Sequence, residues 1–226
     1  MPETESRSSP KRTRRRRKDA RPAEIVEAAE EVFAARGFAA ATLDEVARKA
    51  GVAKGTLYLY FDTKEDLFRA VVRRATEPVT SFQTPPDLPL VLLVPTLLGR
   101  AAEAARGSRL PAIARIVIGE SRAIPGLARI WHDDVVSRLL DLLAEAVARA
   151  QARGEAKPGD PRLHALSIAG ALLAGLLYRE VFGPLGVNEL DLPSLARQHA
   201  ETVLSGLLTP DHPQKGAEPC PTTTTS

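Results

Sequence analysis

Two helix-start signals with a glycine stop between them are the feature that most limits the fold of this chain. Thr42-Leu-Asp-Glu45 and Thr63-Lys-Glu-Asp66 each place a threonine three positions before a carboxylate. In such a capping box the threonine hydroxyl accepts a hydrogen bond from the backbone of the acidic residue, whose side chain binds back to the threonine N–H. Gly51 lies between the two signals, and glycine easily adopts the left-handed conformation that ends many helices. The pattern therefore predicts short helices joined by a tight turn.

The apolar positions around these signals predict a helix-turn-helix. Ile25, Ala29 and Phe33 repeat at helical spacing on a first helix that stops at Gly37. A second helix begins at the first capping box, a third follows the glycine turn, and a fourth begins at the second box. In this motif the helix after the turn lies in the major groove of DNA. The expected ranges are 21–36, 42–50, 53–60 and from 63 onward.

The third of these helices has an unusual outer face. The stretch GVAKGTLYLYF, residues 51–61, carries three aromatic residues in a chain that is only 4% aromatic. At 100° per residue Leu57 faces the core, whereas Gly55 and Leu59 point outward. The glycine allows a close approach of the backbone, the hydroxyls can bind phosphates, and Leu59 can contact a thymine methyl group. The alternative interpretation is that Tyr58 and Tyr60 simply cover a small core.

The stretch TLDEVARKAGVAKGTLYLYFDTKEDLF, within residues 25–71, resembles the DNA-binding domain of the TetR family of transcriptional regulators. The family often has a serine at the start of its recognition helix, where this chain has Ala53 and lacks that hydroxyl cap. The resemblance implies base or groove contacts from the third helix. It also implies phosphate contacts from the starts of the second and fourth helices. The residues that it assigns to DNA are Thr42, Lys54, Gly55, Thr56, Tyr58, Leu59, Tyr60 and Lys64.

Positive charge gathers before the first helix. Residues 1–76 hold 17 Lys and Arg against 12 Asp and Glu, whereas residues 77–226 hold 14 against 16. Because like charges repel and no apolar side chain is available for burial, we expect a disordered basic arm over residues 1–20. Such an arm either lies along phosphates or in a minor groove, or stays a solvated tail. Its cations are Lys11, Arg12, Arg14, Arg15, Arg16, Arg17 and Lys18.

We expect the helix-turn-helix domain over residues 21–76 and a second, larger helical domain over residues 77–209. The predicted fold class is therefore all-α. The stretch EPVTSFQTPPDLP at its start is a poor helix former and is expected to be a linker. One long helix carries a packing seam from His132 to Ala150, and Asp160 and Pro161 form an N-cap and first-turn pair for the next. Residues 210–226 lack apolar content and are expected to be disordered. The helices are expected over 88–105, 110–119, 126–153, 161–182 and 193–208.

The helix over residues 161–182 is apolar nearly all round, so it must be covered on more than one side. Its longest apolar run, ALSIAGALLAGLLY, is shorter than the ~20 residues that span a bilayer. This length favours a helix buried in protein over a membrane-spanning helix. In TetR-like proteins the last two helices form a four-helix bundle with their copies in a second subunit. The resemblance thus implies a homodimer, with a core formed within one chain as the alternative. Small residues at 169, 170, 174 and 175 would let another helix approach closely. The expected interface residues are Ala169, Gly170, Leu173, Ala174, Leu177, His199 and Val203.

The resemblance also implies a small-molecule effector of unknown identity, held inside the larger domain and coupled to DNA affinity. An apolar lining favours a hydrophobic or amphipathic molecule. The polar and aromatic side chains that could line its pocket could equally be ordinary packing or interface residues. These candidates are Arg122, Trp131, His132, His164, Tyr178 and Arg179.

Other function classes find little support in the sequence. We recognise no phosphate-binding glycine loop, no Cys/His metal spacing and no nucleophile paired with a base, so we expect neither an enzyme nor a cofactor or metal site. The single cysteine, Cys220, and a polar N-terminus without an apolar run favour the cytoplasm. The main hypothesis is a ligand-responsive repressor that binds a palindromic double-stranded DNA operator as a dimer. The alternatives are an activator, a non-specific architectural DNA-binding protein, and an interaction protein with a vestigial helix-turn-helix.

Overall fold

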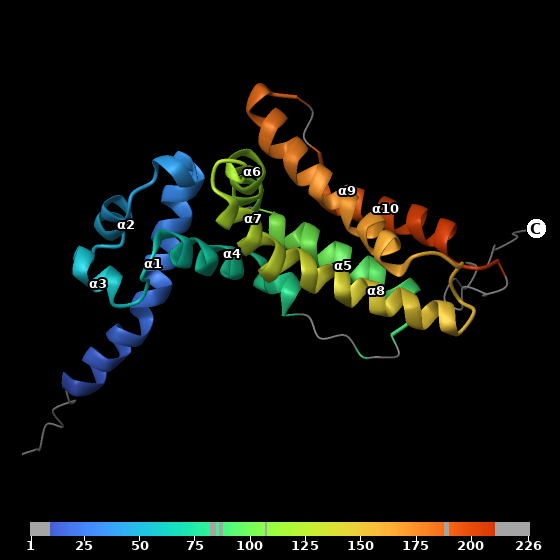
Figure 1. The fold of residues 1–226 in the computed structure, drawn as a ribbon, viewed down its shortest axis with the longest axis horizontal. Coiled ribbons are helices and arrows are strands. Elements are labelled where there is room, and N and C mark those ends of the chain that lie inside the picture. The colour runs from blue at the N-terminus through green and yellow to red at the C-terminus, as the bar shows by residue number, and fades with distance from the viewer. Residues whose placement is uncertain (1–9, 82–84, 86–87, 107, 188–189, 211–226) are drawn as a thin grey trace, which may run out of the picture.

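The described part of the chain is built from helices. The computed structural model describes residues 10–81, 85, 88–106, 108–187 and 190–210, with side chains from residue 21 onward. Within these ranges no β-strand occurs, and one isolated bridge joins Ala156 to Leu208. The all-α fold class is thereby confirmed, with α1, α2 and α3 at one end of the molecule and the bundle of α5, α8, α9 and α10 at the other (Figure 1). The elements are α1 (Pro10–Ala40), α2 (Leu43–Lys49), α3 (Lys54–Tyr58), α4 (Lys64–Thr80), α5 (Leu90–Ala105), α6 (Leu110–Glu120), α7 (Pro125–Trp131), the π-helical η1 (His132–Val136), α8 (Ser137–Ala152), α9 (Pro161–Phe182), the 3-10 turn η2 (Gly183–Leu185) and α10 (Leu192–Leu207).

Both predicted capping boxes are present. The Thr42 hydroxyl accepts from the Glu45 N–H at 3.2 Å, and the Glu45 carboxylate accepts from the Thr42 N–H at 3.0 Å. Thr63 and Asp66 make the same pair of bonds at 3.0 and 3.2 Å. Gly51 has a φ of 66°, a left-handed conformation that other residues adopt only with strain. The turn between α2 and α3 is therefore as expected.

Three phenylalanines form the centre of the N-terminal core. Phe33 of α1, Phe38 and Phe68 of α4 are almost fully buried, with their ring centroids between 5.2 and 5.6 Å apart. Stacked and edge-to-face aromatic pairs of this kind add to the free energy gained by burying the rings. Leu57 of α3 is also fully buried against this core. The short recognition helix is thus anchored through one apolar side chain.

Helix α1 differs from the expectation at both of its ends. It begins at Pro10, so residues 10–20 are helical and the expectation of a disordered arm is wrong for them, while residues 1–9 lie outside the described residues. Arg and Lys are good helix formers, and extending an existing helix avoids the cost of nucleation. At the other end the helix breaks at Gly37, which has a φ of 77° and a ψ of 174°, and helical residues resume up to Ala40. The predicted stop is therefore a kink.

Helix α4 runs into the segment that we expected to be a linker. It continues through Pro78 to Thr80, so the linker begins later than predicted. Thr76 is buried, with its hydroxyl donating to the Val72 carbonyl at 2.8 Å. The Arg100 guanidinium of α5 donates to the Pro78 carbonyl at 3.2 Å. The burial of Thr76 and the bond from Arg100 are tertiary contacts, and they stabilise the end of α4 against the low helix propensity of its sequence.

The long helix expected over residues 126–153 contains a π-helical turn. Helix α7 passes through η1 directly into α8 without a loop. Leu143, Ala146 and Ala150 are buried as the predicted seam requires, but His132 is exposed, so its place on the seam is wrong. A π-turn adds one residue to a helical turn, and the faces before and after η1 are therefore out of register.

The two halves of the molecule share their packing. Ile113 and Ile116 of α6 and Leu127 and Ile130 of α7 are buried in the same core as the helix-turn-helix. A second core is formed by α5, α8, α9 and α10. Helices α6 and α7 therefore bridge the two halves, and a domain boundary near residue 76 stays a prediction.

Helix α9 lies at the surface of the single chain. Its end projects beyond the body of the molecule (Figure 1). Among the described residues one helical stretch, Pro161–Leu185, is long and apolar enough to cross a membrane, with a mean hydropathy of 1.5, and only 22% of it is buried. The same properties are expected of a helix whose exposed apolar face meets a second subunit. Within the described part of the chain α9 packs against α5, α6, α8 and α10, and the cover of its remaining exposed apolar side chains stays a prediction.

Candidate nucleic-acid interface

Helix α3 presents the outer face that the sequence predicts. Leu57 has no exposed surface, whereas Leu59 is 78% exposed and Tyr58 44% exposed. Gly55 is exposed, and a Cβ added there would meet nothing within 4 Å. Thr56 and Tyr60 are half-buried. The face is thus open and low in charge, and Gly55 leaves room for the close approach to DNA that the sequence predicts.

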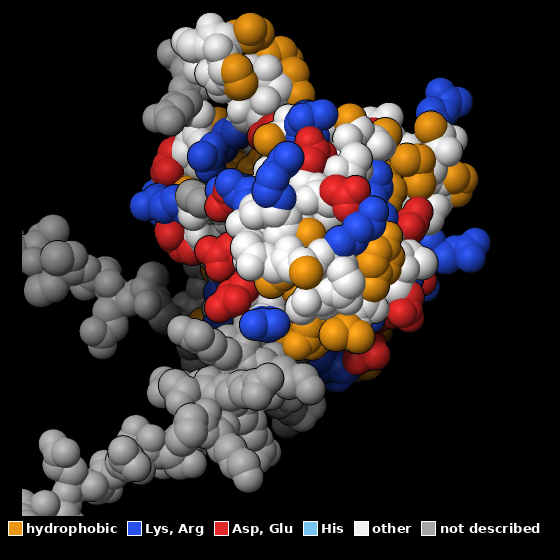
Figure 2. Space-filling model, turned by 90° about the vertical axis from the view of Figure 1, so that its left-hand side faces the viewer, with side chains coloured by type: hydrophobic (Ala, Val, Ile, Leu, Met, Phe, Trp, Pro, Cys, Tyr) orange, Lys and Arg blue, Asp and Glu red, His pale blue; other side chains and the backbone are white. Residues whose placement is uncertain are grey.

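Figure 2 views the molecule from this end. Lys and Arg side chains lie among acidic and uncharged ones and do not form one continuous patch. The cations seen on this end are therefore separate from one another, and residues 11–18 of the sequence contain seven further Lys and Arg.

Lys54 is the cation of the α3 face. Its ammonium lies 2.8 Å from one carboxylate oxygen of Asp44 and 3.0 Å from the other. The hydrogen bond that Lys54 donates to Asp44, together with the negative charge of Asp44, raises the pKa of Lys54 above its usual value. Both side chains are more than half exposed, so the pair links α2 to α3 while the ammonium stays charged and reachable by DNA.

Lys64 has internal partners that the sequence did not reveal. Its ammonium donates to the Ala41 carbonyl at 2.7 Å and to the Ala39 carbonyl at 3.3 Å. It also lies 4.5 Å from the centroid of the Phe38 ring, within the range of a cation–π interaction. The hydroxyl of Thr42 is likewise engaged in the capping box. Phosphate contacts from Lys64 and Thr42 stay predictions, and their structural roles are what the geometry supports.

A buried carboxylate joins α4 to η1. Asp134 is 4% exposed and lies 2.8 Å from Arg73 Nε, 3.3 Å from Arg69 Nε and 3.9 Å from Arg138 Nη2. Only the bond from Arg73 has hydrogen-bond geometry; Arg69 Nε is at ion-pair distance without being aligned. Nothing in the local sequence marked Asp134, because its partners come from other helices. The cluster fixes α4, the helix that follows the recognition helix, to the larger half.

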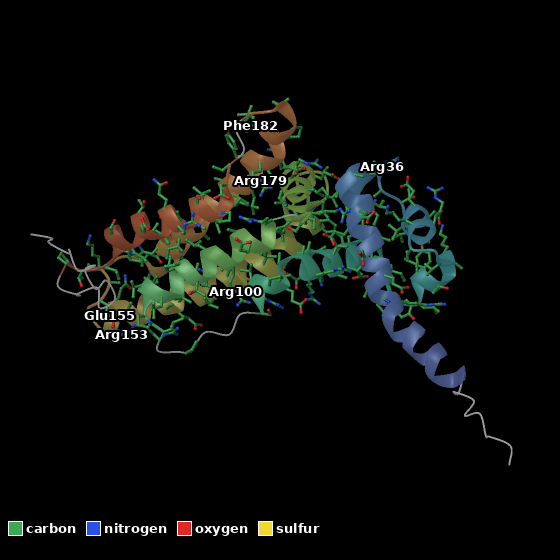
Figure 3. All side chains as sticks on the ribbon, turned by 180° about the vertical axis from the view of Figure 1, so that it is seen from behind. Arg36, Arg100, Arg153, Glu155, Arg179 and Phe182 are labelled. Atoms are coloured by element: carbon green, nitrogen blue, oxygen red, sulfur yellow. The ribbon has the colours of Figure 1, made fainter. Side chains whose placement is uncertain are left out.

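The six candidates for the effector pocket do not line either of two open surface hollows in the described part of the chain. The hollow of about 750 Å³ is lined by residues of α1 and α2 with Arg109, and that of about 320 Å³ by residues of α4, η1 and α8 with Ser81. Trp131 packs between the two cores, Arg122 is exposed, and His132 pairs with Asp133 at 2.9 Å. The Tyr178 ring packs on Phe182 with centroids 5.0 Å apart, and Arg179 and Phe182 mark the projecting end of α9 (Figure 3). His164 is half-buried, and its Nε2 has no hydrogen-bond partner in the described ranges. Their role in effector binding stays a prediction.

The expected interface residues lie on or near the open surface of α9 and α10. None of the seven is fully buried: Leu173 is 39% exposed, and a Cβ added at Gly170 would meet nothing within 4 Å. His199 has its Nε2 3.1 Å from the Ile168 carbonyl. Gly175 differs, because a Cβ there would lie 2.6 Å from Leu195. The small residue at 175 thus accommodates α10 of the same chain, whereas Gly170 leaves space outward.

Comparison with known proteins identifies both halves. Residues 25–71 match the model for bacterial regulatory proteins of the tetR family, and residues 97–204 match the C-terminal domain of AefR-like transcriptional repressors. The chain is 29% identical over 154 residues to the HTH-type transcriptional regulator SrpR of Pseudomonas putida, covering 68% of this chain and 72% of that protein. It is 28% identical over 169 residues to the HTH-type transcriptional repressor BepR of Brucella suis, covering 69% and 80%.

The fold gives the same result. A crystal structure of a TetR family transcriptional regulator from Pseudomonas syringae pv. tomato superposes with a TM-score of 0.66 and 25% identity, over 85% of this chain and 99% of that one. The two structures therefore agree in the helix-turn-helix, in the helical C-terminal half and in the overall arrangement of their helices. The chain belongs to the TetR family of transcriptional regulators.

Proposed function

We propose that this protein is a repressor that binds a palindromic operator as a homodimer and is released by a small molecule. The observation that carries the DNA-binding part is the α3 face, where Gly55, Tyr58 and Leu59 are open above the buried anchor Leu57. An activator or a non-specific architectural protein would share this face, but the kinship with a protein named as a repressor favours repression. We place its action in the cytoplasm, where bacterial DNA is accessible to it.

The uncovered face of α9 supports the dimer. Leu163, Leu166, Leu173, Val181 and Phe182 are each between 39% and 66% exposed on this one helix. Exposed apolar side chains on one element mark an interaction surface. A second copy of α9 would cover them, and a two-fold axis would present two α3 helices to successive major grooves of a palindrome.

The effector is proposed to be hydrophobic or amphipathic. The core of α5, α8, α9 and α10 is lined by leucine, valine and alanine, so any space that opens within it is apolar. Binding there releases DNA only if the molecule binds the DNA-free arrangement more tightly than the DNA-bound one.

Selection of bound DNA from a random pool, followed by titration of two variants, tests the DNA-binding proposal. Tyr58→Ala and Lys54→Ala should each weaken binding to the selected operator by about ten- to hundredfold, since a good groove contact contributes roughly 1–3 kcal/mol. Arg129→Ala, which removes an exposed cation of α7, should bind like the wild type. Equal affinity of all variants, or equal affinity for scrambled DNA at physiological salt, would reject sequence-specific recognition by α3.

A further inference from the structure

We propose that Glu120, the last residue of α6, is a positioning residue for DNA binding. Its carboxylate holds residues 37–42, the short end of α1 after the Gly37 kink together with the two residues before α2, which we call the 37–42 loop. Oε1 accepts a hydrogen bond from the Phe38 N–H at 3.0 Å, and Oε2 accepts one from the Ala39 N–H at 2.6 Å. The inference rests on the proposed DNA-binding function and adds the residue through which the larger half fixes the recognition unit.

The kink at Gly37 makes this contact possible. Its φ of 77° breaks the regular helix just before Phe38, so that successive N–H groups are free to face one carboxylate. A Cβ at Gly37 would lie 2.5 Å from Oε1 of Glu120, closer than real Cβ atoms come to an oxygen. The backbone conformation therefore favours glycine at this position, and any larger residue would have to displace the Glu120 carboxylate.

The loop also presents hydrogen-bond acceptors, which are bound by a cation. The carbonyl groups of Ala39 and Ala41 accept hydrogen bonds from the Lys64 ammonium at the start of α4. The Glu120 carboxylate of α6 thus binds N–H groups of the loop, and the Lys64 ammonium of α4 binds carbonyl groups of the loop. The loop ends at Thr42, whose capping box starts α2. Any movement of the loop is consequently passed to α2 and, through the Lys54–Asp44 pair, to α3.

Helix α6 is attached to α1 at two further points. Arg109 Nη2 lies 3.4 Å from Glu31, and Arg115 Nη2 donates to the Ala34 carbonyl at 3.4 Å. Together with Glu120, these links join α6 to the last part of α1 at three positions. Arg115 also pairs with Glu180 of α9 at 2.8 Å. Helix α6 therefore lies between the helix of the proposed dimer interface and the loop that starts the helix-turn-helix.

This arrangement predicts that DNA affinity depends on Glu120 although the residue does not belong to the recognition face. In the wild type the loop is already ordered when the protein meets DNA. Without the carboxylate, the free loop samples more conformations, and binding must restrict them again. A cap that served folding alone would lower the thermal stability, and the variant protein that remains folded would bind DNA with normal affinity.

The test uses the full-length protein, a selected operator, and the variants Glu120→Ala and Glu120→Gln. Glu103→Gln, at an exposed carboxylate of α5, is the matched control. We expect Glu120→Ala to bind the operator about tenfold more weakly, because loop ordering is added to the cost of binding. Glu120→Gln should fall between, since its amide oxygen keeps one acceptor without the charge. In the free protein the Phe38 and Ala39 amides should exchange hydrogen faster in both variants, and Glu103→Gln should match the wild type.

Three results would overturn the proposal. These are unchanged affinity in both variants, unchanged amide exchange at Phe38 and Ala39, or a loss of affinity that only follows a loss of melting temperature. If Glu120→Ala does not fold, the isosteric Glu120→Gln decides. Should the wild type bind no selected operator, the proposed function fails, while the amide exchange of the free variants still reports whether the carboxylate holds the loop.

Discussion

At the scale of single residues, Asp134 is the side chain whose environment is most demanding. A carboxylate that is 4% exposed needs compensation for its lost hydration, and three arginines that are each about half exposed supply it. We expect Asp134→Asn to lower the free energy of unfolding by about 1–3 kcal/mol, because the charge-assisted bond from Arg73 is lost. Urea unfolding monitored by circular dichroism measures the change.

The neighbouring residue provides the control for this prediction. Asp133 is exposed and pairs only with His132 among the described contacts, so Asp133→Asn should unfold like the wild type. Surface pairs of this kind contribute little to stability. Equal stability of Asp134→Asn and Asp133→Asn would show that the buried cluster does not hold α4 to η1.

Residues whose role follows from local spacing were predictable, and residues whose partners are distant in sequence were not. The burial of Leu57 and the exposure of Leu59 follow from 100° per residue on one short helix. Glu120 and Asp134 find their partners 82 and 61 positions away, and no local pattern records such a contact. Lys64 illustrates the intermediate case: its position was recognised, but its bonds to the 37–42 loop depend on how α1 and α4 pack.

At the scale of elements, the start of α2 should depend on pH. Hydrogen bonds from the Thr42 backbone and hydroxyl hold the pKa of Glu45 below its usual value of 4.5, and Arg36 adds a smaller lowering. A carboxyl group with a lowered folded-state pKa contributes stability that is complete above its unfolded pKa and is lost as the pH falls through its folded pKa. The capping box of α2 should therefore weaken on acidification.

A comparison of the wild type with Glu45→Ala tests this dependence. The wild type should be the more stable protein at neutral pH, and the difference should shrink as the pH is lowered below 4.5, where the carboxylate becomes protonated. Denaturant titrations at a series of pH values give both curves. A difference that is constant down to low pH would mean that the charge of Glu45 does not contribute to the cap.

Observed helix boundaries differ from the predicted ones where tertiary packing outweighs the helix propensity of the residues. The caps at Thr42, Thr63 and Asp160 were predicted correctly because a capping motif is complete within a few residues. The end of α4 was placed too early because buried Thr76 and the Arg100 bond to Pro78 stabilise a turn that its own residues do not favour. The π-turn of η1 was not predicted either, since its register shift accommodates packing on both cores.

At the scale of the whole molecule, two glycines of α9 allow the effect of a substitution on dimerisation to be measured apart from its effect on folding. Gly170 has open space around its Cβ direction, whereas Gly175 faces α10 of the same chain. Gly170→Arg should therefore leave the protomer folded but prevent the approach of a second α9, giving a monomer with little operator binding. Analytical ultracentrifugation and an operator titration measure both effects.

Gly99 of α5 is equally open within the chain and lies on a helix that is not expected at the interface. Gly99→Arg should remain dimeric and bind the operator, and so controls for the cost of arginine on a helix surface. A wild type that sediments as a monomer at micromolar concentration, or a Gly170→Arg variant that stays dimeric, would contradict the proposed interface.

The last prediction concerns the basic segment of residues 11–18, which extends α1 beyond the folded core. Deleting residues 1–18 should leave the dimer and its preferred sequence intact, because Ile25 is the first buried residue among the side chains of α1 that the structure describes. The deletion should weaken binding to all DNA and flatten its salt dependence, since each lost phosphate contact reduces the slope of log affinity against log salt by roughly 0.9. If three or four of the seven cations bind phosphates, the slope falls by about 3 per subunit. A helix that stays in solvent acts only over long range, where charges are screened beyond ~8 Å at physiological salt. Operator titrations of full-length and truncated protein from low to moderate salt distinguish the two cases, and parallel lines would show that the segment makes no phosphate contacts.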